Sequence, residues 1–346
     1  MNSKHLYIHV PLCKDICTFC DFKRDLLCKY DSKKVITYLL KQATKYRKKQ
    51  FKTIYIGGGT PNVFNDDELN YFLSNIKDLL ENNYEFTIEC NPDLITESQI
   101  KILKKNKINR VSLGVQTTND KILKILNRTH TINDCSNAIK LLKKYKFNNI
   151  SIDFMYALPL MKIQDVKDAV NFAIDHNVQH VSFYGLDLKP NAILTKKRYK
   201  IDLDVESEQL DAIIKMFNKT KFKRYEVSNW AISKKYESQH NLAYWLTKDW
   251  AAIGYGACGF ENKISYKYEG TILKPKKISY KLTDMEYYQQ VLIMGLRLKN
   301  GIDISVEPYK TAYNLYKNKL TFIKIKGTIL KCQNINLLNN TLINII

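Results

Sequence analysis

The chain has 346 residues, of which 45% are hydrophobic and 26% are charged, and it contains 23 Tyr, 14 Phe and 3 Trp. This composition excludes a mostly disordered chain, because it supplies enough apolar area for a large core and a smaller appended domain. No run of residues approaches the roughly 18–20 apolar positions that a membrane-spanning helix needs, and no signal-peptide pattern precedes the first predicted strand. We therefore expect a cytoplasmic protein.

The charge is strongly basic. Lys and Arg number 55 against 34 Asp and Glu, which gives a formal net charge of +21 at pH 7. A nucleic-acid partner is one interpretation. The basic residues, however, come as scattered pairs such as Lys33-Lys34, Lys143-Lys144 and Lys276-Lys277. This distribution indicates a bias of the whole composition, so we do not expect a dedicated nucleic-acid site, and attraction to an anionic small ligand is favoured over it.

Short β-rich runs alternate with amphipathic helical patterns along the first two thirds of the chain. The predicted strands cover residues 6–10, 53–56, 86–89, 110–115, 150–156 and 180–186, and the predicted helices cover residues 32–49, 66–80, 97–106, 132–146, 164–177 and 205–220. Six such units in a row predict a parallel sheet with right-handed crossovers. Six units are too few for a closed eight-stranded barrel, so we predict an α/β fold with an open, partial (β/α)6 TIM-like barrel. A doubly wound sheet is the alternative.

The pattern changes after residue 228, where the chain becomes irregular and aromatic. One more helix is predicted at residues 284–298, and a tail rich in Asn and Lys follows it. We therefore expect residues 1–228 to form the barrel and residues 229–346 to form a smaller C-terminal domain. The tail is too short to predict a full winged-helix-like unit.

Three of the eight cysteines, Cys13, Cys17 and Cys20, lie close together directly after the first predicted strand. The other cysteines are far apart, which excludes a disulfide framework. Three thiolates on one tight loop can bind three corners of a cubane and leave the fourth iron open to a substrate. A structural zinc site would need a fourth Cys or His nearby, and the nearest further thiol is Cys28. The spacing therefore predicts a [4Fe–4S] cluster.

Further polar or glycine-rich segments follow the later strands. Glycines at residues 57–59 allow a ligand to approach the backbone closely, and the Glu89 carboxylate can pair with an ammonium group. Arg128 is a candidate partner for a carboxylate, and Asp153 can accept hydrogen bonds from ribose hydroxyls. Together with the CxxxCxxC motif, this arrangement resembles the radical S-adenosylmethionine (radical SAM) superfamily. The resemblance implies that the following residues contact the cluster or SAM: Tyr7, Gly58, Thr60, Glu89, Gln116, Arg128 and Asp153.

The resemblance extends beyond the superfamily. Segments at residues 7–11, 110–116 and 152–159 resemble the group that contains the oxygen-independent coproporphyrinogen III oxidases and the related haem chaperones. Later segments, at residues 225–230, 240–245 and 295–301, continue the match to about Ile304.

Three features favour the chaperones within this group. Phe22 stands where the oxidases have a fourth cysteine, and only six residues precede Tyr7, where the oxidases have an extension. His240 begins a His-Asn-x-x-Tyr-Trp motif that is typical of the chaperones. The resemblance implies that His240 is an axial ligand of haem iron, with Tyr244 and Trp245 covering the porphyrin. From residue chemistry alone, a structural histidine at a domain junction is the stronger interpretation.

One departure concerns Cys258, which stands where the family usually has a histidine and could replace it as a thiolate ligand. The resemblance implies a haem chaperone that carries a [4Fe–4S] cluster and SAM, receives electrons from a donor, and delivers haem to an acceptor protein. Peripheral contact with a membrane is compatible with this function. The alternatives are oxidative decarboxylation of coproporphyrinogen III and radical SAM modification of tRNA.

Overall fold

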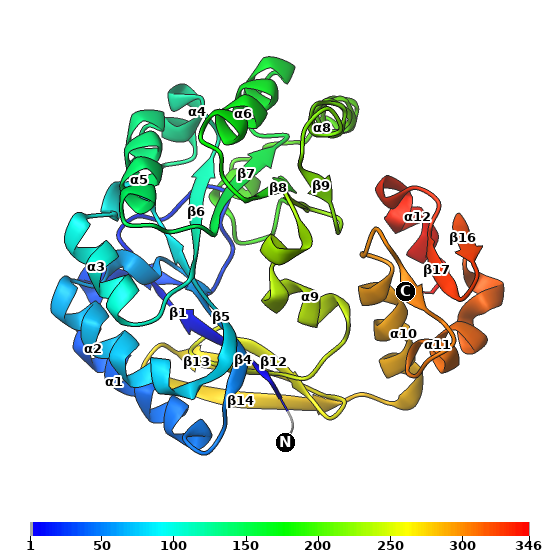
Figure 1. Ribbon diagram of the computed structural model, residues 1–346, viewed down its shortest axis with the longest axis horizontal. Helices are drawn as coiled ribbons and strands as arrows, with labels where there is room; N and C mark the ends of the chain where they lie inside the picture. Colours follow the sequence, from blue (N-terminus) through cyan, green and yellow to red (C-terminus); the bar gives the residue numbers. More distant parts are fainter. Residues whose placement is uncertain (1–2, 346) are drawn as a thin grey trace.

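The computed structural model describes residues 3–345, and its centre is a twelve-stranded sheet. Six parallel strands form the middle of this sheet, in the order of the chain, and Figure 1 shows them inside an arc of helices. These strands are β1 (His5–Val10), β4 (Phe51–Gly58), β5 (Leu80–Cys90), β6 (Arg110–Gln116), β7 (Ile150–Tyr156) and β8 (His180–Gly185). The six predicted strands are therefore confirmed in position and in parallel pairing.

The helices that connect the strands lie along the outer side of the curved sheet (Figure 1). They are α1 (Ser32–Ala43), α2 (Asp66–Ile76), α3 (Glu97–Lys105), α4 (Asp120–Ile125), α5 (Ile132–Lys144), α6 (Ile163–Asp175) and α8 (Leu203–Phe217). The short α7 (Ile193–Lys196) instead contacts the cysteine loop, where the N–H of Leu194 donates to the carbonyl of Thr18 at 2.9 Å. Capping boxes begin several of them; at α2, for example, Asn65 and Glu68 accept hydrogen bonds from each other's backbone N–H. Because these helices cover one side of the sheet, the doubly wound alternative is wrong.

Within the described residues the sheet does not close into a full barrel, since β9 and β14 form its two edges. At one edge of the sheet, the short strands β10 and β9 follow β8 in antiparallel pairing. On the other side, β11 runs parallel to β1, and the antiparallel meander of β12, β13 and β14 continues the sheet. These strands are β9 (Lys223–Arg224), β10 (Asn229–Ala231), β11 (Trp250–Ile253), β12 (Cys258–Glu261), β13 (Ile264–Thr271) and β14 (Lys274–Lys281). The predicted open, partial barrel is confirmed, and the strands that follow residue 228 continue its sheet.

A second apolar core forms near the C-terminus, away from the barrel (Figure 1). Its buried residues include Val291, Leu296, Leu330 and Leu342. The elements around it are α10 (Asp284–Gly295), β15 (Ile302–Asp303), α11 (Tyr309–Tyr316), β16 (Ile323–Lys326), β17 (Ile329–Cys332) and α12 (Leu338–Leu342). The Asn-rich tail therefore takes part in an ordered unit of helices and a three-stranded sheet.

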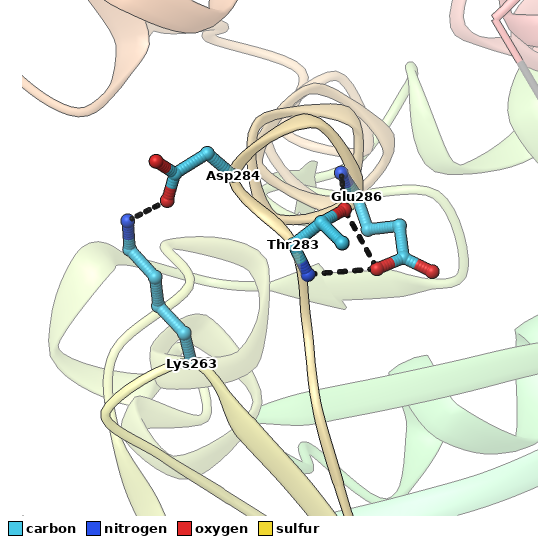
Figure 2. A network of polar contacts seen from close by, with 4 residues as sticks. All are labelled: Lys263, Thr283, Asp284 and Glu286. Carbon is cyan, nitrogen blue, oxygen red and sulfur yellow. Dashed lines mark hydrogen bonds and ion pairs between the residues drawn. The ribbon is translucent and has the colours of Figure 1, made fainter.

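The start of α10 is fixed by two sets of contacts, which Figure 2 shows. The Glu286 carboxylate accepts hydrogen bonds from the backbone N–H and the hydroxyl of Thr283, at 2.7 and 2.8 Å. Lys263, in the turn between β12 and β13, pairs with Asp284 at 2.7 Å. The meander of the main sheet is thereby tied to the first helix of the C-terminal unit.

Two of the segments that carried the family resemblance meet just after the end of α10. The backbone of Glu226 pairs with that of Leu298, and the N–H of Lys299 donates to the carbonyl of Tyr225 at 3.0 Å.

In the part of the chain that the structure describes, no helix is long and apolar enough to cross a membrane.

Candidate functional site

The inner face of the barrel is polar, although the strands of a parallel sheet are usually apolar on both faces. In β1, for example, Leu6 and Ile8 are fully buried beneath the helices, whereas Tyr7 and His9 bond each other on the inner face. Hydrogen bonds between side chains of neighbouring strands place further polar residues on that face: Tyr55, Glu89, Arg110, Ser112, Ser151, Asp153 and His180. Strict alternation of apolar and polar residues in six parallel strands is a sequence signal for such an interior, and our prediction did not use it.

The inner face opens into a cavity of about 680 Å³ at the carboxyl ends of the strands. The structure brings all of the predicted site residues to this cavity except Tyr7 and His240. They are Cys13, Cys17, Cys20, Gly58, Thr60, Glu89, Gln116, Arg128 and Asp153. The site was predicted because loops at this end of a (β/α) barrel converge.

The cysteine loop lies against two arginines. The guanidinium of Arg128 donates to the Cys17 Sγ at 3.4 Å, and that of Arg24 donates to the Cys20 carbonyl at 2.6 Å. Burial raises the pKa of the Cys13 thiol to about 11, while the positive charge of Arg24 lowers it. Arg24 therefore favours the thiolates of Cys13 and Cys20, whose burial favours the thiols.

All three cysteines of this loop line one cavity, as a cluster requires. A cubane distributes its thiolate ligands over separate irons, so the three thiols need to face one cavity but need not meet at one point. Among residues 3–345, no three side chains of His, Cys, Asp or Glu converge on a point where they could hold one metal ion.

The glycine segment after β4 passes directly beneath the cysteine loop. A Cβ added at Gly59 would lie 2.5 Å from the carbonyl oxygen of Leu12, and Gly58 has a φ of +112°. The N–H of Thr60 donates to the same Leu12 carbonyl at 2.8 Å. Gly59 is therefore required because a side chain would not fit against Leu12, and Gly58 is required because of its positive φ. The segment holds the cysteine loop in place.

Glu89 is a partly buried carboxylate of the cavity wall. It accepts hydrogen bonds from the Tyr55 hydroxyl at 2.7 Å and from the N–H of Gly58 at 3.1 Å. Desolvation, with a smaller contribution from the charge of Asp153, raises the pKa of Glu89 to about 7 against the lowering effect of these two hydrogen bonds. Its charge at neutral pH therefore depends on its partners, and a ligand ammonium would favour the ionised form.

Near Glu89, two polar atoms of residues that line the cavity have no hydrogen-bond partner among the described residues. The Oε1 of Gln116 and the Nε of Arg128 are buried and form no hydrogen bond. Arg128 uses its Nη2 to hold both the Gly114 carbonyl and the Asn91 side chain, each at 2.8 Å. The wall itself carries the Glu89 carboxylate and the Arg128 guanidinium, which fit the ammonium and the carboxylate of an amino-acid ligand.

Tyr7 lies outside the cavity wall. Its hydroxyl contacts the Nδ1 of His9 at 3.1 Å, and the other ring nitrogen of His9 contacts the carbonyl of Lys23 at 2.7 Å. A Cβ on Gly58 would lie 2.7 Å from the His9 ring. In this structure, Tyr7 supports the glycine segment through His9 rather than lining the cavity itself.

His240 lies in α9 (Gln239–Trp245), beneath the barrel interior and away from the cavity. It is 1% exposed, and its two ring nitrogens contact the Thr53 hydroxyl and the Tyr244 hydroxyl, each at 2.7 Å. Its ring also stacks on Tyr55, with the centroids 5.2 Å apart. With both nitrogens occupied, this geometry favours the structural interpretation of His240. Cys258 is exposed at the start of β12 and is also absent from the cavity wall.

Comparisons with known proteins agree with this geometry. The model of the radical SAM superfamily matches residues 7–173. The heme chaperone HemW of Lactococcus lactis subsp. lactis is 33% identical over 336 residues, which cover 93% of this chain and 86% of that protein. The heme chaperone HemW of Bacillus subtilis is 29% identical and covers 86% and 84% of the two chains.

Among solved structures, the chain is similar to the coproporphyrinogen III oxidase HemN from Escherichia coli, a radical SAM enzyme. The TM-score is 0.82, and the match covers 99% of this chain and 89% of that one. The sequences are 15% identical, so this similarity shows the fold alone.

Proposed function

The chain belongs to the radical SAM superfamily and, within it, to the family of the HemW haem chaperones, and we propose that it binds haem and delivers it to an acceptor protein. The observation that carries the proposal is the similarity to HemW of Lactococcus lactis over 93% of the chain. Similarity of this extent includes the barrel and the C-terminal unit together.

We further propose that Cys13, Cys17 and Cys20 hold a [4Fe–4S] cluster and that SAM binds along the cavity wall. When bound, a reduced cluster of this kind supplies a single electron to SAM. The chain's own residues have other tasks. The ionised Glu89 would hold the amino group of SAM, and Arg128, beside Cys17, would hold its carboxylate.

We propose that Asp153 binds the ribose. Its carboxylate accepts a hydrogen bond from Ser112 at 2.8 Å and lines the cavity. Gln116, which lines the same cavity, would also contact the ligand. The buried wall excludes water from the reacting groups, which strengthens each of these contacts.

The haem site is the least defined part of the proposal. Coordination of iron by His240 stays a prediction, and it requires the contacts with Thr53 and Tyr244 to open. The partners that the proposal names are haem, a haem-accepting protein and an electron donor for the cluster, in the cytoplasm.

The test is anaerobic reconstitution followed by parallel assays with haem and with coproporphyrinogen III. We expect about four iron and four sulfide per chain, saturable binding of haem, and no decarboxylation. Cys17→Ala should abolish the cluster, and Cys28→Ala, which changes a cysteine outside the cavity, serves as the matched control. Turnover of coproporphyrinogen III without haem binding would favour the oxidase instead.

A further inference from the structure

A second, strongly basic groove lies at the opposite end of the barrel, and the proposed function does not use it. Its volume is about 520 Å³, and it runs across the amino ends of β4 to β7. Four lysines line it, which we call the lysine groove: Lys52, Lys104, Lys146 and Lys235. They come from four separate segments of the chain, so the fold alone gathers them.

None of these four ammonium groups has a carboxylate within 4.0 Å among the described residues. The nearby Lys101 and Lys144 differ, since both pair with Glu97. Glu85 supplies the one carboxylate among the described residues that line the groove. Its two oxygens accept hydrogen bonds from the backbone N–H groups of Gln239 and His240, each at 3.0 Å. The carboxylate that lines the groove therefore does not neutralise the positive charge of its four lysines.

Three further contacts partly fix two of the lysines. The Nζ of Lys104 donates to the carbonyl of Lys146 at 2.8 Å and lies 4.3 Å from the centre of the Phe147 ring. The Nζ of Lys235 lies 5.5 Å from the centre of the Tyr236 ring. The groove thus presents cations whose positions are set in part by the protein.

We propose that the lysine groove binds a small anion that carries two or more phosphate groups. Compact ammonium charges from several directions suit a chain of phosphates, and four exposed lysines without carboxylate partners leave their mutual repulsion uncompensated until an anion binds. The net charge of +21 attracts such a ligand over a distance.

The experiment uses the full-length chain after cluster reconstitution, at constant ionic strength, with tripolyphosphate and ATP as separate probes in titration calorimetry. We expect saturable binding with one site per chain, weakened at least tenfold in the Lys104→Gln/Lys235→Gln double variant. The matched control is Lys101→Gln/Lys144→Gln, which removes the same charge from the same region and should leave the affinity unchanged within twofold. Equal weakening in both double variants, or binding that does not saturate, would overturn the proposal.

A second measurement on the unmodified chain does not depend on the folding of variants. Tripolyphosphate should protect Lys104 and Lys235 from acetylation while Lys101 stays reactive, and loss of this difference would refute the assignment. Tighter binding of ATP than of tripolyphosphate would support a nucleoside polyphosphate, and equal binding would support the phosphate chain alone. Binding of an RNA oligonucleotide that exceeds both probes and is lost in the groove variant would replace the small ligand with nucleic acid. None of these outcomes depends on whether the chain binds haem.

Discussion

Tyr55 is expected to control the affinity for SAM, although it was not predicted as a site residue. Its hydroxyl donates to Glu89 at 2.7 Å, and burial raises the pKa of Glu89 to about 7. Tyr55→Phe keeps the ring that stacks on His240 and removes only this hydrogen bond. The substitution therefore tests the electrostatic contribution of one hydroxyl group without opening a cavity.

The size of the effect follows from the charge of Glu89. A hydrogen bond to a charged group contributes about 1.5–3 kcal/mol, so its loss strengthens proton binding to Glu89 by about tenfold at the lower end of this range and by more than about a hundredfold at the upper end. At pH 7 the ionised fraction of Glu89 then falls from about one half to about one tenth or less, which predicts SAM binding that is weaker by at least about fivefold. At pH 9 a much larger fraction of the carboxylate is ionised, so the ratio of the two affinities should fall towards one.

The assay is equilibrium binding of SAM to both proteins under anaerobic conditions at pH 7 and pH 9. The ratio of the two dissociation constants at each pH cancels the titration of SAM itself. A ratio near one at pH 7 would show that Glu89 does not act through its charge. An equal ratio above one at both values would show that Tyr55 acts through geometry, and it would refute the electrostatic reasoning.

Three further substitutions test the structure at other points. As the predicted ligand of haem iron, His240 should give a shifted Soret band and weaker haem binding when it is changed to Ala, while the cluster stays intact. His240→Ala should also lower the melting temperature by a few degrees, because the buried Tyr244 hydroxyl loses a partner at about 1–3 kcal/mol. A lower melting temperature with an unchanged Soret band would show that His240 has only a structural role. Burial raises the pKa of Glu226 from 4.5 to about 7. The contribution of its protonated form to the free energy of unfolding is therefore complete below pH 4.5, and up to about 3 kcal/mol of it is lost as the pH rises to 7. In Glu226→Gln the free energy of unfolding should depend less on pH in this window, and an unchanged slope would contradict the assignment. Gly59→Ala should displace the cysteine loop, which we expect to see as a lower iron content after reconstitution, and a full complement of iron would show that the loop adapts.

Much of the barrel was predictable because its signals are local. Each strand is a short β-rich run followed by a turn, and most of the helices begin at a capping residue, so the six units could be located from residues near one another in the chain. The three cysteines could be identified in the same way, because all of them lie on one loop. The predicted rim residues, such as Glu89 and Arg128, follow from the rule that loops at the carboxyl ends of parallel strands converge.

The C-terminal unit was less predictable. Its strands are short, and a core that is shared by α10, α11 and the three-stranded sheet depends on residues up to about fifty positions apart. A tail rich in Asn and Lys shows no strong period, so its order comes from packing and not from local preference.

By itself, the sequence determined the order of the elements, the cysteine loop and the family, because these depend on residue type and spacing along the chain. Only the tertiary structure decided which side chains meet. It placed Tyr55 on Glu89, enclosed His240 between two hydroxyl groups, and gathered four lysines from separate segments into one groove. Such contacts join residues far apart in the chain, and they depend on the curvature of the sheet and on which face each strand turns inward. A one-dimensional pattern does not contain that information, because the energy of a buried polar group depends on the partners that folding brings to it.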